Sequence, residues 1–422
     1  MTTRTSDAPP PEAGIHPHQA HEHARSAAPF VSGLRLGRVF GIEIFVDWSV
    51  AIIFMLVAVG LGAGALPRWH PEWSGALRWV VAVAAALAFF ASILLHELSH
   101  AVVGRAFGIK VPRITLFIFG GMAHMQGEPT SPKAELFMAA VGPLTSLFIG
   151  ITASFVGVQL AVLAGGAPDN PEHLVRMAGP VATILLWLGP LNFLLAIFNL
   201  VPGFPLDGGR LLRAAIWSAT GDLDKATRWA SAAGRAVGWG LITIGALMAF
   251  GFWVPFFGTG LGSGIWVALI GWFLQHAARA SYIALRLKTR LSHVSVREVM
   301  RSNLDTAAPE MTVAELVRDH VMRSDQASFP VLEGPELVGV ISVRDIQLVP
   351  SEQWPWVTVR QVMLPASEVP SVDVGANADK ALECLAERDM EQLPIVDHGR
   401  LSGFVRRQDI LKWLSLQPEP AI

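Results

Sequence analysis

Six apolar stretches, each with few charged residues, dominate the middle of the chain. Their approximate ranges are 48–66, 79–100, 134–164, 180–200, 230–250 and 263–282. A helix needs about 20 apolar residues to cross the hydrocarbon core of a bilayer, and most of these stretches are close to that length. The third is long enough to tilt or to continue past the membrane. The pattern predicts a polytopic α-helical membrane protein with about six spans, within a membrane domain at residues 31–285.

A second pattern begins after Lys288, where the composition becomes that of a soluble domain. Short segments recur there at offsets of 63 or 64 residues. The matching pairs are 294–300 with 357–363, 329–331 with 393–395, and 339–345 with 403–409. Each copy has the pattern of a short strand, a helix, two apolar strands and a final helix. The repeat predicts a duplicated α/β module with copies at residues 293–350 and 356–416.

The first 30 residues show neither pattern. They are rich in Pro, Ala and His, and they include His16, His18, His21 and His23. This composition lacks the apolar residues that a packed core needs, so we predict a disordered N-terminal tail at residues 1–30. The histidines are interpreted either as part of a solvated polar tail or as a tract that scavenges metal.

Composition agrees with a membrane protein. Hydrophobic residues make up 52% of the 422 residues and charged residues 16%, whereas soluble globular proteins have about 25% charged residues. The formal net charge is −2. The chain therefore has no overall positive field, and nucleic acid is not an expected partner.

The distribution of Lys and Arg among the loops predicts the orientation, because cytoplasmic loops carry an excess of these residues. One set of loops holds Arg35, Arg38, Arg105, Lys110, Arg113, Lys133, Arg210, Arg213, Lys225, Arg228, Arg286, Lys288 and Arg290, and the other holds Arg68, Arg78 and Arg176. The basic set should be cytoplasmic. We therefore expect a multi-pass protein of the cell membrane with both termini, and the α/β module, in the cytoplasm.

The second apolar stretch ends in the motif His96-Glu97-Leu98-Ser99-His100. On a helix, residues four apart share one face, so both imidazoles can reach one metal ion while Glu97 lies beside it. A charged side chain within a bilayer costs about 2.5–3.5 kcal/mol on insertion scales and needs a partner. The alternative, core histidines and a buried glutamate without metal, leaves three costly groups unpaired. We therefore predict a zinc site.

Zinc in hydrolases has three protein ligands and a position for water, whose pKa falls to about 7. Glu97 would take the proton of that water and pass it to the leaving amine. The candidate third ligand is Asp207, because the segment 199–210 ends the fourth span and contains prolines and glycines that let the chain turn. Two alternatives stay open: Asp207 is a helix N-cap, or His124 is the third ligand.

At these residues the chain resembles the site-2 protease family of intramembrane zinc metalloproteases. The resemblance rests on HELSH at 96–100, FGGMAHM at 119–125 and NLVPGFPLDGGR at 199–210, and it covers about residues 35–285. It implies one zinc ion bound by His96, His100 and Asp207, with Glu97 as the acid and base. One departure is Ser146, where relatives often have asparagine. That difference concerns packing near the third span and not the zinc ligands.

The resemblance also implies which residues hold the substrate. Asn199 helps to hold the substrate or to stabilise the oxyanion. Gly120 and Gly121 form a β element that dips into the membrane and pairs with an unwound substrate strand. A helical peptide bond is shielded and must be extended before attack, and pairing with a strand edge achieves this.

The repeat resembles a tandem pair of CBS (cystathionine-β-synthase) domains, which usually pair into one disc and bind adenine nucleotides. The ribose-contact pattern of that family, G-x-x-[ST]-x-x-D, occurs at 339–345 with Ser342 and Asp345. In the second copy, Arg406 replaces the hydroxyl residue and Asp409 remains. The resemblance implies a regulatory adenine nucleotide contacted by Ser342, Asp345 and Asp409, and a homodimer formed through the CBS pair. A purely structural or dimerising module is the alternative.

Together these features predict an intramembrane zinc metalloendopeptidase that cleaves transmembrane segments of membrane-anchored proteins and is modulated by adenine nucleotide. The resemblance implies regulated intramembrane proteolysis of an anti-sigma factor or another membrane-anchored regulator. One alternative is a CBS-gated transporter or channel, which needs carboxylates spread over several spans. The other is a catalytically inactive scaffold, which predicts a damaged motif, whereas both parts of the motif are intact.

Overall fold

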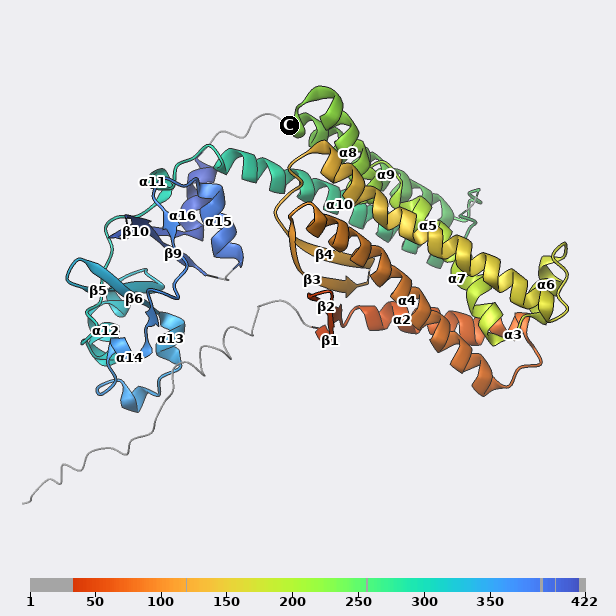
Figure 1. The fold of residues 1–422 in the computed structure, drawn as a ribbon, viewed down its shortest axis with the longest axis horizontal. Helices are drawn as coiled ribbons and strands as arrows, with labels where there is room; N and C mark the ends of the chain where they lie inside the picture. Colours follow the sequence, from red (N-terminus) through yellow and green to blue (C-terminus); the bar gives the residue numbers. More distant parts are fainter. Residues whose placement is uncertain (1–32, 119, 256, 388–389, 399, 417–422) are drawn as a thin grey trace, which may run out of the picture. The chain divides into compact units, whose positions relative to one another are not determined.

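The computed structural model describes residues 33–118, 120–255, 257–387, 390–398 and 400–416. The tail predicted at residues 1–30 lies outside these ranges. Contacts divide the described chain into two compact units, a membrane unit at Val31–Arg286 and a CBS unit at Leu287–Ile422 (Figure 1).

Within its described residues, the membrane unit contains six helices that are long and apolar enough to cross a bilayer, which confirms the predicted spans. The first span, Val50–Trp69, consists of α2 (Val50–Val59), the π-helix η1 (Gly60–Ala65) and α3 (Leu66–Trp69). The others are α4 (Gly75–Ala106), α5 (Pro132–Leu163), α7 (Pro180–Asn199), α9 (Leu223–Ala249) and α10 (Leu261–Leu291). Two shorter helices are α6 (Pro171–Met177) and α8 (Asp207–Thr220). Helices α9 and α10 extend beyond their apolar stretches, because the flanking polar residues continue each helix.

Helix α5 is central to the membrane unit, where it packs against α4, α7 and α8 (Figure 1). Helices α9 and α10 approach each other through glycines. A Cβ atom on Gly271 would lie 2.6 Å from the backbone oxygen of Gly238, and one on Gly264 would lie 2.5 Å from that of Gly245. Small residues at such interfaces let helix backbones pack closely in a membrane.

A four-stranded mixed sheet packs against α4. Its strands, in spatial order, are β1 (Gly33–Val39), β2 (Ile42–Asp47), β3 (Lys110–Phe117) and β4 (Gly120–Gln126). The pair β2–β3 is parallel and the other two pairs are antiparallel. The sheet packs on Ala101 of α4 through the buried side chains of Ile42, Ile44 and Ile114. The predicted Gly120–Gly121 element thus begins β4, an edge strand.

In the part of the CBS unit that the structure describes, two three-stranded sheets have helices around them, as the repeat predicts. The first copy comprises α11 (Val296–Val299), α12 (Val313–Asp319), η2 (Val321–Arg323), β5 (Ser328–Glu333), β6 (Glu336–Ser342), α13 (Val343–Gln347) and η3 (Ser351–Gln353). The second comprises α14 (Val359–Val362), β7 (Leu364–Pro365), β8 (Val372–Asp373), α15 (Ala378–Glu387), β9 (Gln392–Asp397), β10 (Arg400–Arg406) and α16 (Arg407–Ser415). Helix α11 of the first copy packs in the apolar core around β9, and α14 of the second packs in the core around β5, so each core combines residues of both copies.

Each copy also contributes backbone to the sheet of the other. β7 follows α14 in the second copy but pairs with β6 of the first, with Pro365 opposite Gly339. In return, Arg301 of the first copy forms an antiparallel bridge to Phe404 of β10. The side chains of Val340 and Phe404 share a buried cluster between the sheets. The two copies therefore fold as one unit.

Candidate metal centre

Three side chains converge inside the membrane unit. His96 and His100 lie one turn apart on α4, and Asp207 is the first residue of α8. Oδ2 of Asp207 lies 3.1 Å from Nε2 of each histidine, and the two Nε2 atoms are 3.2 Å apart. All three side chains are buried. Asp207 is more than 100 residues from the histidines in sequence, so the fold alone brings them together.

The outer ring nitrogens of both histidines are held by other groups. Nδ1 of His100 lies 2.6 Å from the backbone oxygen of Met138, and Nδ1 of His96 lies 2.9 Å from Oγ of Ser146. A carbonyl oxygen only accepts hydrogen bonds, so Nδ1 of His100 carries the proton and Nε2 presents a lone pair. The serine hydroxyl can accept the corresponding proton of His96. Two imidazole lone pairs and a carboxylate then face one another, and this donor set fits a zinc ion.

Gly142 of α5 leaves open the space between the ligands. A Cβ atom on Gly142 would collide with Nε2 of His100 and would lie 2.6 Å from Nε2 of His96. The third span therefore leaves room for an ion where the three donor atoms meet, because it has no side chain at that point. The sequence gives no direct sign of this role, because a glycine in an apolar span is common.

Gly142→Ala should displace the metal. The added methyl occupies the space of the ion, and overpacking of this kind costs about 1–3 kcal/mol, so zinc affinity should fall roughly 10-fold or more. Zinc content of the purified variant measures the effect. Gly240→Ala is the matched control, because Gly240 lies within α9 and a Cβ atom there meets nothing within 4 Å. Unchanged zinc content in Gly142→Ala would contradict the assignment of this space.

Tight packing of the chain before α8 orients Asp207 toward the two histidines. The N-cap residue of α8 is Leu206, which makes no side-chain cap bond, so Asp207 lies inside the helix and its carboxylate faces the histidines. A Cβ atom on Gly208 would collide with the backbone of Leu200. The rival ligand His124 lies on β4 with Nε2 3.2 Å from Oγ1 of Thr115, and it is not part of the cluster.

A cavity of about 1,140 Å³ adjoins the cluster. Its lining includes every protease residue that the sequence predicts, namely His96, Glu97, His100, Gly120, Gly121, Asn199 and Asp207. Side chains of α2, α4, α7 and α10 form much of the remaining wall, and most of them are apolar. Ligand pockets have volumes of about 300–1,000 Å³, so this cavity is large enough for a peptide segment.

Strand β4 approaches Glu97 closely because Gly121 has no side chain. A Cβ atom on Gly121 would collide with Cγ of Glu97 and would lie 2.8 Å from its Cδ. Asn199, the last residue of α7, donates from Nδ2 to the backbone oxygen of Leu195 at 3.0 Å. A carboxylate, a strand edge and an amide therefore surround one space beside the ligand cluster.

A buried ion pair joins α8 to α5. Nε of Arg213 donates to Oε1 of Glu135 at 2.6 Å, and Nη2 contacts the same oxygen. Glu135 is fully buried, and the guanidinium of Arg213 lies 5.2 Å from the ring centroid of Phe204. Removing one partner of a buried pair leaves an uncompensated charge, which costs about 3–5 kcal/mol. The pair therefore fixes the helix that carries Asp207, and sequence analysis did not find it.

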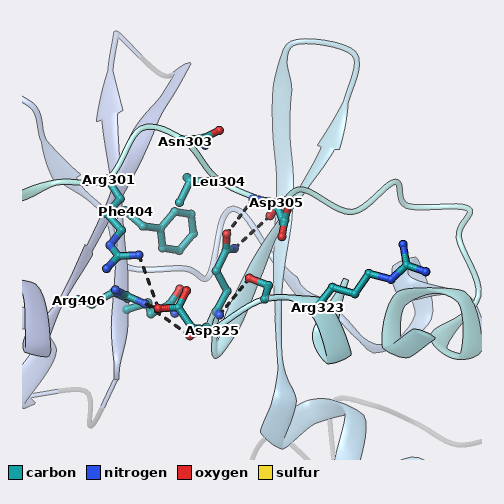
Figure 2. A pocket seen from close by; sticks show the side chains of 11 residues that line it. Arg301, Asn303, Leu304, Asp305, Arg323, Asp325, Phe404 and Arg406 are labelled. Carbon is teal, nitrogen blue, oxygen red and sulfur yellow. Dashed lines mark hydrogen bonds and ion pairs between the residues drawn. The ribbon is translucent and has the colours of Figure 1, made fainter. Parts of the chain in front are cut away.

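The CBS unit has an ion-pair network between its two copies. Figure 2 shows Arg301, Asp325 and Arg406 around a cavity of about 240 Å³. Nε of Arg406 donates to Oδ2 of Asp409 at 2.7 Å, and Nη1 donates to Oδ2 of Asp325 at 3.0 Å. Nε of Arg301 donates to Oδ1 of Asp409 at 3.2 Å. Asp409, a predicted nucleotide contact, is therefore bound by two guanidinium groups.

These contacts keep both carboxyl groups ionised. The hydrogen bond from Arg406 lowers the pKa of Asp325 below its ordinary value. Partial burial raises the pKa of Asp409, but the hydrogen bond and charge of Arg406 outweigh it, so the net shift is downward. Both groups therefore stay charged in the neutral pH range, where the network holds the copies together.

In the first copy, the two predicted nucleotide contacts bind each other. Oγ and the backbone N–H of Ser342 donate to Oδ2 of Asp345 at 2.6 and 2.8 Å. The backbone N–H of Asp345 donates back to Oγ at 3.2 Å, which forms a capping box at the start of α13. This geometry is sufficient for a structural role, so nucleotide binding stays a prediction.

The fold and the cluster define a polytopic membrane protein with a buried metal-binding group beside a cavity. Peptidase family M50 matches residues 84–241, and the CBS domain family matches residues 296–351 and 359–416. Two relatives, each named "Putative zinc metalloprotease", are sll0528 of Synechocystis sp. and Rip3 of Mycobacterium tuberculosis. They are 31% identical over 386 residues and 32% identical over 391 residues. Each alignment covers 91% of this chain, and 96% and 94% of the respective relatives.

Among solved structures, the site-2 protease from Methanocaldococcus jannaschii aligns with a TM-score of 0.38 and 28% identity, over 59% of this chain and 95% of that chain. The nearly full-length similarity to the two relatives shows that the chain belongs to Peptidase family M50, the site-2 protease family. It is a membrane zinc metalloprotease with tandem CBS domains, as the sequence predicts.

Proposed function

We propose that the protein is an intramembrane zinc metalloendopeptidase that cuts the transmembrane segments of membrane-anchored proteins. The convergence of His96, His100 and Asp207 beside a large cavity in the membrane unit carries this proposal. The carboxylates among the described residues lining that cavity are Glu97 and Asp207. Asp207 belongs to the cluster and Glu97 adjoins it, whereas a transporter or channel would need carboxylates spread along its path.

We assign His96, His100 and Asp207 as the metal ligands and Glu97 as the acid and base. A zinc ion held there supplies a Lewis acid that polarises a peptide carbonyl and activates water. Glu97 takes the proton of the attacking water and later gives it to the leaving nitrogen. The mostly apolar wall excludes bulk water, which strengthens the electrostatic interactions within the cavity.

We propose that the substrate binds as an added strand on β4. This strand lies at the edge of its sheet and pairs with β3 on one side. Its residues Gly120 and Gly121 line the cavity beside Glu97. Free backbone groups of an edge strand can pair with an extended peptide, which would hold an unwound transmembrane segment for attack. Asn199, which also lines the cavity, then helps to hold the chain.

The orientation is also a proposal. The excess of Lys and Arg in one set of loops favours a cytoplasmic location for both termini. His100 lies near the end of α4 that adjoins these basic loops, and Asp207 follows the corresponding end of α7. The cut would then fall near the cytoplasmic face and release the cytoplasmic part of a membrane-anchored regulator, such as an anti-sigma factor.

Comparison of two strains tests the proposed activity without a known substrate. One strain carries the wild-type chain and the other carries Glu97→Gln. Membrane proteomics should find truncated membrane-anchored proteins that accumulate in the Glu97→Gln strain. Identical membrane proteomes, together with metal-dependent ion flux through wild-type protein in liposomes, would instead support a transporter.

We further propose that an adenine nucleotide binds the CBS unit at Ser342 and Asp345 and modulates cleavage. The ribose-contact pattern of the first copy supports this, because a hydroxyl and a carboxylate suit a ribose diol and a strand-to-helix junction suits phosphate. In the second copy, Asp409 would contact the nucleotide only after giving up its hydrogen bonds to Arg301 and Arg406.

Ser342→Ala should weaken the binding of AMP, ADP or ATP to the full-length protein about 10-fold, which is the loss expected from one or two hydrogen bonds. Calorimetry measures it. Thr312→Ala is the matched control, because Thr312 and Glu315 form the same capping box at α12 without the ribose pattern. Basal cleavage should be unchanged in both variants. Undetectable binding to wild-type protein would leave the CBS pair with a structural or dimerising role.

A further inference from the structure

The catalytic cavity contains one permanent cation among the described residues that line it. Arg210 contributes the guanidinium, while the other ionisable side chains of the wall are the three ligand candidates and Glu97. Arg210 follows Asp207 by three positions on α8, so both side chains lie on the same side of that helix. Its side chain is 18% exposed. The proposed function gives this residue no role.

Arg210 and Arg213 lie on the same helix, α8, but they differ in their hydrogen bonds. Arg213 is bound to the buried carboxylate of Glu135, as described above. Nε of Arg210 lies 3.9 Å from Oε1 of Glu135, which is too far for a hydrogen bond. Within the described residues, the side chain of Arg210 forms no hydrogen bond. A guanidinium has five N–H donors, so Arg210 presents donors and a positive charge to the cavity.

The amide of Asn199 is less available. Its Nδ2 already donates to the backbone oxygen of Leu195 within α7. An amide is also neutral, whereas a guanidinium is charged at every physiological pH. The group that is best suited to stabilise an oxyanion in this cavity is therefore on α8 and not at the end of α7.

We propose that Arg210 is a catalytic residue that binds the oxygen of the scissile carbonyl and stabilises its negative charge, which rests on the proposed proteolytic function. When water attacks, its oxygen bonds to the carbonyl carbon, its proton passes to Glu97, and the carbonyl π electrons move onto the oxygen. Arg210 donates hydrogen bonds to that oxyanion. The carbonyl then re-forms, the C–N bond breaks, and Glu97 returns the proton to the leaving nitrogen.

The charge develops in the transition state, so the loss of Arg210 should lower kcat and change KM little. Removing one oxyanion donor typically costs about 10²–10³ in kcat, and this range is expected for Arg210→Gln. Arg210→Lys should retain part of the activity, because the ammonium keeps the charge without the fork of donors. Zinc content and thermal stability of both variants should match those of the wild type.

A second readout separates catalysis from structure. A phosphinic peptide mimics the tetrahedral oxyanion, whereas a peptide hydroxamate binds mainly through metal chelation. Arg210→Gln should weaken phosphinate binding about as much as it lowers kcat/KM, and it should leave hydroxamate binding within a few-fold. Arg213→Gln is the matched control from the same helix. It should lower thermal stability and zinc content together, because it breaks the buried pair with Glu135.

Two results would overturn the role of Arg210. One is a kcat within about 3-fold of the wild type in Arg210→Gln, well below the loss expected of an oxyanion donor. The other is a loss of zinc and stability like that of Arg213→Gln, which would make Arg210 a structural partner of Glu135. Absence of zinc-dependent peptide cleavage by the wild-type protein would refute the proposed function itself. An inactive Glu97→Gln beside a fully active Arg210→Gln would refute only the inference on Arg210.

Discussion

Glu97→Gln should abolish peptide hydrolysis and leave zinc bound. The amide has nearly the same shape as the carboxylate but cannot accept the proton of the attacking water. General acid–base catalysis contributes about 10²–10⁴ to the rate, so residual cleavage of less than about 1% is expected. His96, His100 and Asp207 are unchanged, so the metal content should stay at the wild-type level. Cleavage of a labelled transmembrane peptide in proteoliposomes, with zinc analysis of the same sample, measures both.

Glu43→Gln is the control for this substitution. Glu43 is a carboxylate of the same unit, but it lies in β2 and pairs with Arg35 and Arg38 outside the cavity. Surface pairs contribute about 0–1 kcal/mol, so this variant should cleave normally. Glu97→Gln with cleavage as fast as Glu43→Gln would remove Glu97 from the mechanism.

Asp207→Ala should lose both zinc and activity. The carboxylate is the single donor that α8 contributes to the cluster, and without it two histidines of one helix remain. Mutating an outer-shell partner of a ligand costs about 10–100-fold in metal affinity, so removing a ligand itself should cost at least about 100-fold. Zinc titration against a chelator of known affinity measures the loss. Added zinc in excess should restore little cleavage, because the two-histidine site is incomplete.

Asp222→Ala is the matched aspartate control. Asp222 caps the neighbouring helix α9, where its Oδ1 accepts from the backbone N–H of Lys225 at 2.9 Å. Loss of such a cap costs about 1 kcal/mol of stability and should leave zinc affinity unchanged. Normal zinc affinity in Asp207→Ala would mean that the third ligand is another residue.

The sequence predicted the features that depend on residues close together along the chain. Each transmembrane helix contains a long apolar stretch, and the two histidines and Glu97 lie close together in sequence, so the six spans and the motif were both readable. The repeat was readable because its two copies match residue by residue. The partners of these residues could not be read in the same way. Ser146 was associated with packing of the third span, whereas its hydroxyl in fact contacts His96.

Residues that act through long-range contacts were missed for the same reason. Gly142 shows its role only when α5 lies against α4, and Glu135 finds Arg213 across 78 residues of chain. Strands β1 and β2 were also missed. Arginines and glycines interrupt the apolar pattern of β1, and the sheet that includes both strands also needs β3, which follows α4 in the sequence.

Zinc-edge X-ray absorption of the full-length protein tests the assignment of the zinc ligands most directly. The four histidines at 16–23 should be replaced by serine for this experiment, because they are competing ligands. We expect about one zinc ion per chain, bound by two imidazoles and by oxygen without sulfur. Protein that is active but free of zinc, or zinc whose spectrum lacks imidazole scattering, would contradict the assignment of His96, His100 and Asp207.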